Sequence, residues 1–489
     1  MSEYKNRVVN AVAISGGSRV VIQLVSLGYT ITLARLLTPD DFGLITMVAV
    51  FTGFAGLLAD VGLGSALIQK KDVTELDYST VFWTNLGLGL FFTGLIFISS
   101  DWIAAFYQRE ELSLIAKILS LQFVLDAIRL VPGNRLAREL HFGYVAIANL
   151  LGMLCAGALA VYMAVVGYGF WALAWQAVAS SVVTTLVICL SCRWIPRLAF
   201  SFSALKGLVN FSMYVFGTQM IQYGARTVDK LLAGRYLGSD AVGILGRAQT
   251  LLLLPLKNIS HVVGNVMFPA LSMVQDDVAR VRRVYLRSTQ AIALATFPMM
   301  LGMMAVADNF VVGVLGEQWA AMIPIIRILS IAGIASSIVT ITGSVYLSQG
   351  ASKLQFRVNL VTRPIAILGV VIGLPWGLVG IATGSLVAVL INTQITLSRA
   401  GSLIGLRLLD FFRALLPTLI AASLMAVPVF LIGFYLDLEK PLVELLIQVL
   451  AGVVLYIGLA IGMKLPALTD LHGLVKSRIK RKAGSEKSS

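Results

Sequence analysis

The chain has 489 residues, of which 58% are hydrophobic and 13% are charged, and its formal net charge is +14. A soluble protein keeps about a quarter of its residues charged, so this composition excludes an ordinary soluble globular protein. A mean hydropathy of +0.88 indicates a lipid environment. Most basic residues fall in short connections between apolar segments, which points to control of membrane topology rather than to nucleic-acid binding.

Apolar segments of about 20 residues recur along the whole chain, and a helix of that length crosses the roughly 30 Å of a bilayer core. Lipid cannot hydrogen-bond the backbone, so each segment has to satisfy its own polar groups as a helix. We therefore predict an all-α polytopic membrane protein with about fourteen transmembrane helices. The expected spans, in chain order, are 12–33, 43–67, 79–99, 112–131, 143–166, 169–192, 207–229, 241–267, 288–313, 321–347, 354–374, 376–398, 413–435 and 441–463.

Helix-start signals support the second and the eighth of these spans. Thr38-Pro39-Asp40-Asp41 combines a capping threonine, a proline at the first helical position and acidic residues in the first turn. Ser239-Asp240 offers the same kind of cap before the eighth span. We expect both helices to begin next to these signals.

The distribution of Lys and Arg predicts which side of the membrane each connection faces. With the N-terminus placed in the cytoplasm, the predicted outer loops hold few basic residues, namely Arg35, Arg109, Lys230, Arg235 and Lys440. Most of the others fall in the predicted inner segments, which is the bias that sets the orientation of membrane proteins. The sequence therefore predicts a multi-pass protein of the bacterial inner (cytoplasmic) membrane with both termini in the cytoplasm.

An internal repeat divides the chain. The segment Arg35-Leu-Leu-Thr-Pro-Asp-Asp-Phe-Gly43 reappears two hundred residues later as Arg235-Tyr-Leu-Gly-Ser-Asp-Ala-Val-Gly243. We infer two six-helix lobes in parallel orientation, an arrangement that puts a substrate path between the halves. The predicted parts are 1–200 as the N-lobe with helices 1–6, 201–400 as the C-lobe with helices 7–12, 401–464 as helices 13 and 14, and 465–489 as a basic cytoplasmic tail.

Ionisable side chains inside the predicted spans are the functional candidates, because charges at membrane depth are costly and face a cavity or a partner. Basic residues outnumber acidic ones there, which predicts a positive cavity suited to an anionic substrate. The candidates for the substrate cavity are Arg19, Gln23, Arg226, Arg247, Lys257, Arg327 and Arg363. The candidates for ion coupling are Asp60, Asp229 and His261.

Two other features have a plain structural interpretation. Asp126 and Arg129 lie three residues apart in one predicted helix, so they are expected to pair with each other. Cys189 and Cys192 have C-x-x-C spacing, but packing in a helix explains them better than a redox or zinc site. We find no phosphate-binding loop, metal-ligand cluster or nucleophile motif, so we predict a transporter without a cofactor or metal rather than an enzyme.

The order of motifs along the chain resembles that of a known family. The motifs are Ser15-Gly-Gly-Ser-Arg19, Ala34-Arg-Leu-Leu-Thr-Pro-Asp-Asp-Phe-Gly43, Asp60-Val-Gly-Leu-Gly64, Asp229-Lys-Leu-Leu-Ala-Gly-Arg235 and Gly316-Glu-Gln-Trp319. Over nearly its whole length the chain resembles the bacterial polysaccharide flippases, the Wzx-type transporters of the MOP exporter superfamily. The branch that it resembles most is associated with the export of colanic acid and lipopolysaccharide.

This resemblance implies translocation of an undecaprenyl-pyrophosphate-linked oligosaccharide for exopolysaccharide or lipopolysaccharide synthesis. It implies alternating access through a cationic cavity, coupling to a gradient of H⁺ or Na⁺, and contact with the polysaccharide polymerase machinery. There are three alternatives, and the excess of basic residues and the short outer loops argue against the last two. A lipid II flippase would differ mainly in substrate, and a multidrug or cation antiporter of the same superfamily would need an acidic, aromatic cavity. A membrane-bound polymerase or ligase would need a sizeable outer loop.

Overall fold

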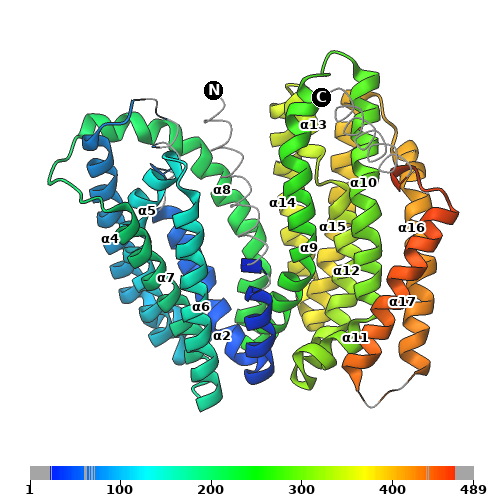
Figure 1. Ribbon diagram of the computed structural model, residues 1–489, viewed down its shortest axis with the longest axis horizontal. Coiled ribbons are helices and arrows are strands. Elements are labelled where there is room, and N and C mark those ends of the chain that lie inside the picture. The colour runs from blue at the N-terminus through cyan, green and yellow to red at the C-terminus, as the bar shows by residue number, and fades with distance from the viewer. Residues whose placement is uncertain are drawn as a thin grey trace, which may run out of the picture. The chain divides into compact units, whose positions relative to one another are not determined.

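In the part of the chain that the computed structural model describes, all regular secondary structure is helical (Figure 1). The described residues are 22–23, 25–59, 63–64, 67, 70, 72–436, 438 and 440–468, and for 203–204, 206–218, 221 and 254–266 only the backbone is described. The chain divides into two compact units, Met1–Gly243 (unit 1) and Ile244–Ser489 (unit 2). The predicted lobes, with their boundary at residue 200, are the two copies of the sequence repeat, whereas units 1 and 2 are defined by their compact packing. The predicted lobe boundary therefore stays a prediction.

Unit 1 is built from long helices packed side by side. Its helices are α2 (Pro39–Ala59), α4 (Glu75–Tyr107), α5 (Glu111–Arg138), α6 (Phe142–Val166), α7 (Trp171–Cys192), α8 (Phe202–Leu237) and the first turn of α9 (Ser239–Ser272). Helix α4 packs along α5, α6 packs along α7, and α5 contacts α7 and α2. This arrangement makes α5 a central helix of unit 1.

Unit 2 continues α9 and adds the remaining helices. These are α10 (Val278–Ala305), α11 (Ala307–Phe310), α12 (Ile323–Ile338), α13 (Thr342–Ser348), α14 (Ser352–Gly373), α15 (Gly377–Ile404), α16 (Leu408–Tyr435) and α17 (Pro441–Gly462). Short turns of π-helix (Val311–Leu315) and 3₁₀-helix (Glu317–Met322 and Leu374–Trp376) connect some of them. Its core joins α10 to α16, where the rings of Tyr285 and Phe411 lie 5.8 Å apart.

The helices match the predicted spans in position and in composition. Every predicted span from the second onward overlaps a helix in the described part of the chain, and nine helical stretches there are long and apolar enough to cross a membrane. One of the nine, Ser352–Ile404, contains both α14 and α15. The all-helical membrane fold is confirmed, whereas the count of fourteen spans and the side of each terminus stay predictions.

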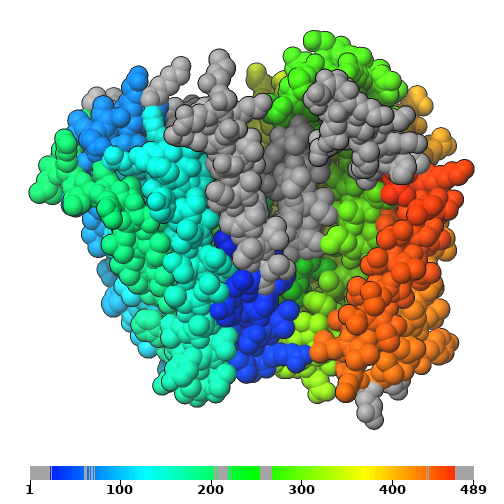
Figure 2. Space-filling model, in the orientation of Figure 1, coloured from blue at the N-terminus to red at the C-terminus, as the bar shows by residue number. Residues whose placement is uncertain are grey.

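Apolar side chains cover the outer surface of the helices, as a lipid environment requires. On α17, Leu446, Leu450 and Val454 are each more than half exposed. Figure 2 shows the surface that α16 and α17 form, in orange and red. A soluble protein rarely exposes so continuous an apolar face, so this surface fits contact with acyl chains.

The cap predicted at Thr38 is confirmed, whereas the one predicted at Ser239 is not. Helix α2 begins at Pro39, where the Asp41 backbone N–H donates to Thr38 Oγ1 at 3.3 Å and the Thr38 N–H donates to Asp41 Oδ2 at 2.9 Å. These reciprocal bonds form a capping box. Helix α9 begins at Ser239 itself rather than after it, and the Ser239 hydroxyl is bonded to Asp40 instead of capping its own helix.

Helices α14 and α15 approach each other closely because glycines line their contact. A Cβ atom on Gly384 would overlap the carbonyl oxygen of Gly369, and one on Gly380 would overlap that of Gly373. Small residues of this kind let helix backbones pack tightly in lipid, where van der Waals contact drives helix association.

We expect Gly384→Val to lower the stability of the protein, because a side chain at this position must force α14 and α15 apart. Overpacking of a tight contact costs about 1–3 kcal/mol. The apparent melting temperature in detergent measures the effect. The matched control is Gly458→Val on α17, where an added Cβ meets no neighbouring atom within 4 Å. Equal melting temperatures for the two variants would contradict the close contact.

Candidate functional site

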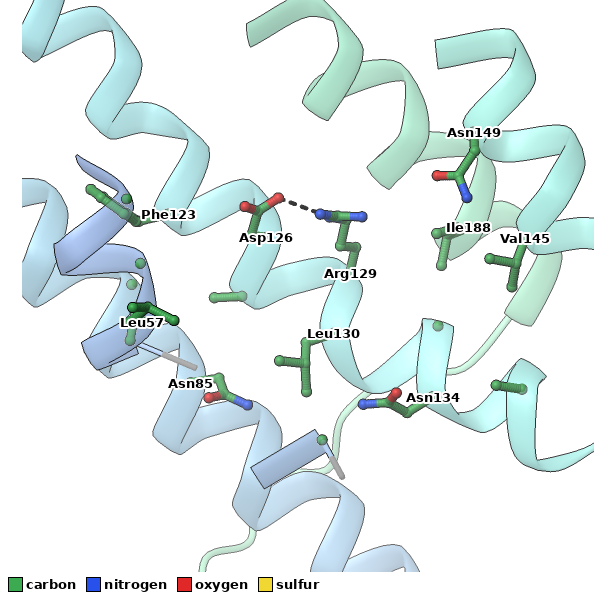
Figure 3. A pocket seen from close by; sticks show the side chains of 18 of the residues that line it. Leu57, Asn85, Phe123, Asp126, Arg129, Leu130, Asn134, Val145, Asn149 and Ile188 are labelled. Atoms are coloured by element: carbon green, nitrogen blue, oxygen red, sulfur yellow. Dashed lines mark hydrogen bonds and ion pairs between the residues drawn. The ribbon is translucent and has the colours of Figure 1, made fainter. Parts of the chain in front are cut away.

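A cavity of about 740 Å³ lies inside unit 1 among α2, α4, α5 and α6 (Figure 3). Ile188 of α7 and Tyr223 of α8 complete its wall. Glycines make up much of the lining on α2 and α4, including Gly53, Gly56 and Gly89, and a Cβ atom on Gly53 would overlap the hydroxyl of Tyr223. We call this cavity the unit 1 pocket.

Helix α5 supplies one continuous face of the unit 1 pocket. Phe123, Asp126, Leu130, Asn134 and Ala137 line it at intervals of three or four residues, which places them on one side of a helix. Helix α5 is 28 residues long, yet it is not among the nine helical stretches that are apolar enough to cross lipid unaided. Its polar residues Asp126, Arg129 and Asn134 line the pocket, which spares them contact with acyl chains.

The charges in the unit 1 pocket balance. Arg129 Nε donates to Asp126 Oδ1 at 2.8 Å, and the two side chains are 37% and 46% exposed. The predicted pairing of these residues is therefore confirmed. Because the pair combines one positive and one negative charge, it adds no net charge to the pocket.

Asn85 on α4 is the most unusual polar residue in the lining. It is 3% exposed, and in the described part of the chain neither its Nδ2 nor its Oδ1 atom has a hydrogen-bond partner. A buried polar group without a partner costs about 1–3 kcal/mol, so such groups are uncommon in folded proteins and call for an explanation. Asn134 and Asn149 also line the pocket, which brings three amides to it from three helices.

Several predicted candidates fall where the structure gives no side chain. Arg19 and Asp60 lie outside the described residues. Lys257 and His261 belong to α9, but only their backbone is described. The proposed roles of these four residues stay predictions.

The other candidates in unit 1 lie on two helical segments. Gln23 is half-buried in the first described helical residues, and Arg226 is exposed on α8. Asp229, one turn further along α8, is 9% exposed, and its Oδ1 accepts a hydrogen bond from the Lys230 backbone N–H at 2.8 Å. None of these three residues lines the unit 1 pocket, although Tyr223 on the same helix does.

In unit 2, Arg247 and Arg363 are half-buried on α9 and α14. Arg327 on α12 forms an ion pair with Asp308 of α11 and lies over the ring of Phe430, 5.9 Å from its centroid. The Arg327 and Asp308 side chains border a smaller cavity of about 250 Å³. A guanidinium neutralised in this way is less available to an anionic substrate than an unpaired one.

A buried hydrogen-bond network lies beside the smaller cavity of unit 2. Asn309 Nδ2 donates to Glu444 Oε1 at 2.7 Å and to Gln448 Oε1 at 3.0 Å. Glu444 is 4% exposed, and Gln448 Nε2 donates to the Val429 carbonyl oxygen at 3.0 Å. This network was not predicted from the sequence. The carboxylates and amides within the predicted spans that contain α11 and α17 could have indicated it.

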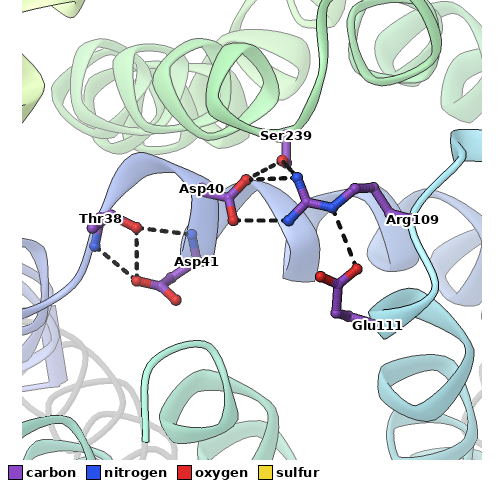
Figure 4. Close-up of polar contacts among 6 residues, drawn as sticks. All are labelled: Thr38, Asp40, Asp41, Arg109, Glu111 and Ser239. Atoms are coloured by element: carbon purple, nitrogen blue, oxygen red, sulfur yellow. Dashed lines mark hydrogen bonds and ion pairs between the residues drawn. The ribbon is translucent and has the colours of Figure 1, made fainter. Parts of the chain in front are cut away.

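A polar cluster joins three parts of unit 1 (Figure 4). Arg109, in the turn between α4 and α5, makes two hydrogen bonds to the carboxylate of Asp40, at 3.2 and 3.1 Å, and one to Ser239 Oγ at 3.1 Å. Arg109 Nε also contacts Glu111 at 3.3 Å. The bond with Asp40 raises the pKa of the Arg109 guanidinium above its usual range.

The two copies of the repeated motif contact each other at this cluster. A Cβ atom on Gly43 would overlap the carbonyl oxygen of Ser239, and one on Gly243 would overlap that of Pro39. The contacts are reciprocal, because Pro39 and Gly43 correspond to Ser239 and Gly243 at an offset of two hundred residues. The predicted alignment of these motifs therefore has a structural counterpart in the way α2 and α9 begin.

We expect Arg109→Met to lower the apparent melting temperature, because it leaves Asp40 without its cationic partner. The pair is partly exposed, so the loss should be about 1 kcal/mol. The matched control is Lys353→Met, which removes an exposed cation from α14. A control that melts as low as Arg109→Met would show that the cluster does not stabilise unit 1.

Comparison with known proteins decides the family. A family model described as "Polysaccharide biosynthesis protein" matches residues 32–324, more than half of the chain. The chain belongs to this family. Its membership confirms the resemblance to polysaccharide flippases that the sequence motifs indicate.

Relatives in this polysaccharide biosynthesis family cover most of the chain. It is 29% identical over 349 residues to the teichuronic acid biosynthesis protein TuaB of Bacillus subtilis, covering 69% of each protein. It is 29% identical over 377 residues to the lipopolysaccharide biosynthesis protein WzxC of Escherichia coli, covering 74% of each. It is 27% identical over 300 residues to the succinoglycan biosynthesis transport protein ExoT of Rhizobium meliloti, covering 61% of this chain and 60% of that protein.

Solved structures support the MOP-type fold. The lipid II flippase MurJ in an inward closed conformation matches with a TM-score of 0.75 and 14% identity, covering 93% of this chain and 99% of that one. An inward-facing multidrug resistance transporter of the MATE family matches with a TM-score of 0.62 and 17% identity, covering 78% and 94%. At such low sequence identities the similarity shows the fold and does not indicate the substrate.

Proposed function

We propose that this protein is a flippase that translocates an undecaprenyl-pyrophosphate-linked oligosaccharide across the bacterial inner membrane. In this proposal it serves exopolysaccharide or lipopolysaccharide synthesis as a secondary transporter rather than as an enzyme. The observation that carries the proposal is membership of a polysaccharide biosynthesis family over residues 32–324. The helical membrane fold, with neighbours that include a lipid flippase and a MATE transporter, supports it.

The physical problem that such a protein solves is the passage of a polar head group through hydrocarbon. An oligosaccharide and a pyrophosphate both lose their hydration on entering lipid, and the charged group loses the most. A polar path through the protein removes that barrier, while the polyprenyl tail stays in the bilayer. In an alternating-access cycle the path opens to one side of the membrane at a time.

The proposed roles of the charged candidates follow from this chemistry. Arginine binds phosphate oxygens through paired N–H groups, so Arg19, Arg226, Arg247 and Arg363 are the proposed contacts of the pyrophosphate, with Gln23, Lys257 and Arg327 as further polar groups of the path. Asp60, Asp229 and His261 are the proposed groups for coupling to H⁺ or Na⁺. Contact with the polysaccharide polymerase would hand the translocated unit on to polymer assembly.

We expect cells that lack this protein to stop exporting one polysaccharide and to accumulate its lipid-linked repeat unit in the cytoplasmic leaflet. The reason is that assembly of the unit continues while its passage across the membrane stops. Extraction of the undecaprenyl-linked lipids, followed by mass spectrometry, measures the accumulation. A plasmid copy of the gene is the control and should restore export. Normal export in a deletion strain with no redundant transporter would contradict the proposal.

A further inference from the structure

The unit 1 pocket presents uncharged amides rather than the cations that are predicted for the substrate path between the lobes. Asn85 on α4, Asn134 on α5 and Asn149 on α6 line it (Figure 3). Among the described residues of its lining, Asp126 and Arg129 are the charged ones, and they are bonded to each other at 2.8 Å. Such a lining does not attract ions over a long range, but it offers many hydrogen bonds at short range.

Asn85 is the strongest indication that the pocket receives a ligand. Its side chain is 3% exposed, and both of its amide atoms lack a partner in the part of the chain that the structure describes. An amide presents a donor and an acceptor next to each other. A hydroxyl group also donates and accepts, so a polyol satisfies both atoms of Asn85, whereas a phosphate, which only accepts, satisfies one.

The ion pair points the same way. A pyrophosphate in the pocket would lie near the carboxylate of Asp126, which repels it, and would compete with that carboxylate for Arg129. Neutral sugar hydroxyls meet no such repulsion, because they donate to the carboxylate and accept from the guanidinium. The Asp126–Arg129 pair therefore fits a neutral polar ligand better than an anion.

The size and position of the pocket fit a sugar. Its volume of about 740 Å³ lies within the roughly 300–1,000 Å³ typical of small-molecule sites. Its lining extends along α5 to Ala137 and onto Phe142, on either side of the turn between α5 and α6. Arg135 and Arg138 place this turn on the predicted cytoplasmic side, which is the side from which the substrate of the proposed function enters.

We infer that the unit 1 pocket binds neutral sugar units of the oligosaccharide, with Asn85, Asn134 and Asn149 bonded to their hydroxyls and the pyrophosphate bound elsewhere. This inference rests on the proposed function and adds that the sugar and the pyrophosphate of the substrate bind at different sites. The amides recognise the sugar part of the substrate, and the arginines outside this pocket hold the charged part.

The test compares two lipid probes that differ only in their sugar. One is the undecaprenyl-pyrophosphate oligosaccharide extracted from the deletion strain, and the other is undecaprenyl pyrophosphate without sugar. Binding of each probe to the purified full-length protein in nanodiscs gives the dissociation constants. The variants are Asn85→Leu and Asn149→Leu, and the matched control is Asn392→Leu, an asparagine on α15 outside the pocket.

We expect wild-type protein to bind the glycosylated probe more tightly than the sugar-free one. Asn85→Leu should weaken binding of the glycosylated probe about tenfold, and Asn149→Leu about threefold, as expected for the loss of one buried or one exposed hydrogen bond. Neither change should alter binding of the sugar-free probe, and Asn392→Leu should alter neither. Because Asn85→Leu removes an unsatisfied buried amide, its melting temperature should equal or exceed that of wild type.

Two outcomes would overturn the inference while the proposed function stands. One is wild-type affinity of both pocket variants for the glycosylated probe, which would mean that Asn85 is bonded only to water. The other is an equal loss of affinity for both probes when the exposed residue Asn149 is changed to Leu, which would place the pyrophosphate in the pocket. Failure of wild-type protein to bind the glycosylated probe at all would instead contradict the proposed function.

Discussion

Hydrocarbon cannot hydrogen-bond a peptide group or solvate a charge, and this constraint shapes every level of the protein. The backbone satisfies its own hydrogen bonds as helices, and several cations at or near membrane depth pair with a carboxylate. Lys117 lies 3.6 Å from Asp101, Arg129 is bonded to Asp126, and Arg327 is paired with Asp308. Each of these pairs neutralises one of the basic residues that lie within the predicted spans.

The same constraint explains why the unit 1 pocket is informative. Helix α5 is too polar to face lipid along its whole length, and three of its polar residues, Asp126, Arg129 and Asn134, line the unit 1 pocket. A transporter of amphiphilic lipids needs such a surface, because the head group of its substrate must exchange hydrogen bonds with water for hydrogen bonds with protein. An orphan amide such as Asn85 lowers stability, and proteins accept losses of this kind mainly where function requires them.

Much of the fold could be predicted from sequence because hydrophobic length and caps are local signals. The helices from the second predicted span onward, the start of α2 at Pro39 and the Asp126–Arg129 pair all depend on residues close together in the chain. The pocket could not be predicted in this way, since Asn85 and Asn149 come from different helices. The pairing of Arg327 with Asp308 was not predicted for a similar reason. The two residues lie on different helices, α12 and α11, which short turns of π-helix and 3₁₀-helix separate.

The measurement that tests the account most directly is translocation in proteoliposomes. Purified protein would be reconstituted with a radiolabelled undecaprenyl-pyrophosphate oligosaccharide, and the fraction of label that reaches the opposite leaflet would be followed over time. The account predicts translocation by wild type and by the control Arg407→Gln, and about tenfold slower translocation by Arg226→Gln, which loses a charged hydrogen bond to phosphate. No translocation by folded wild-type protein, with several glycan donors, would contradict the claim that this protein translocates lipid-linked oligosaccharides. The assignment of the fold would be unaffected.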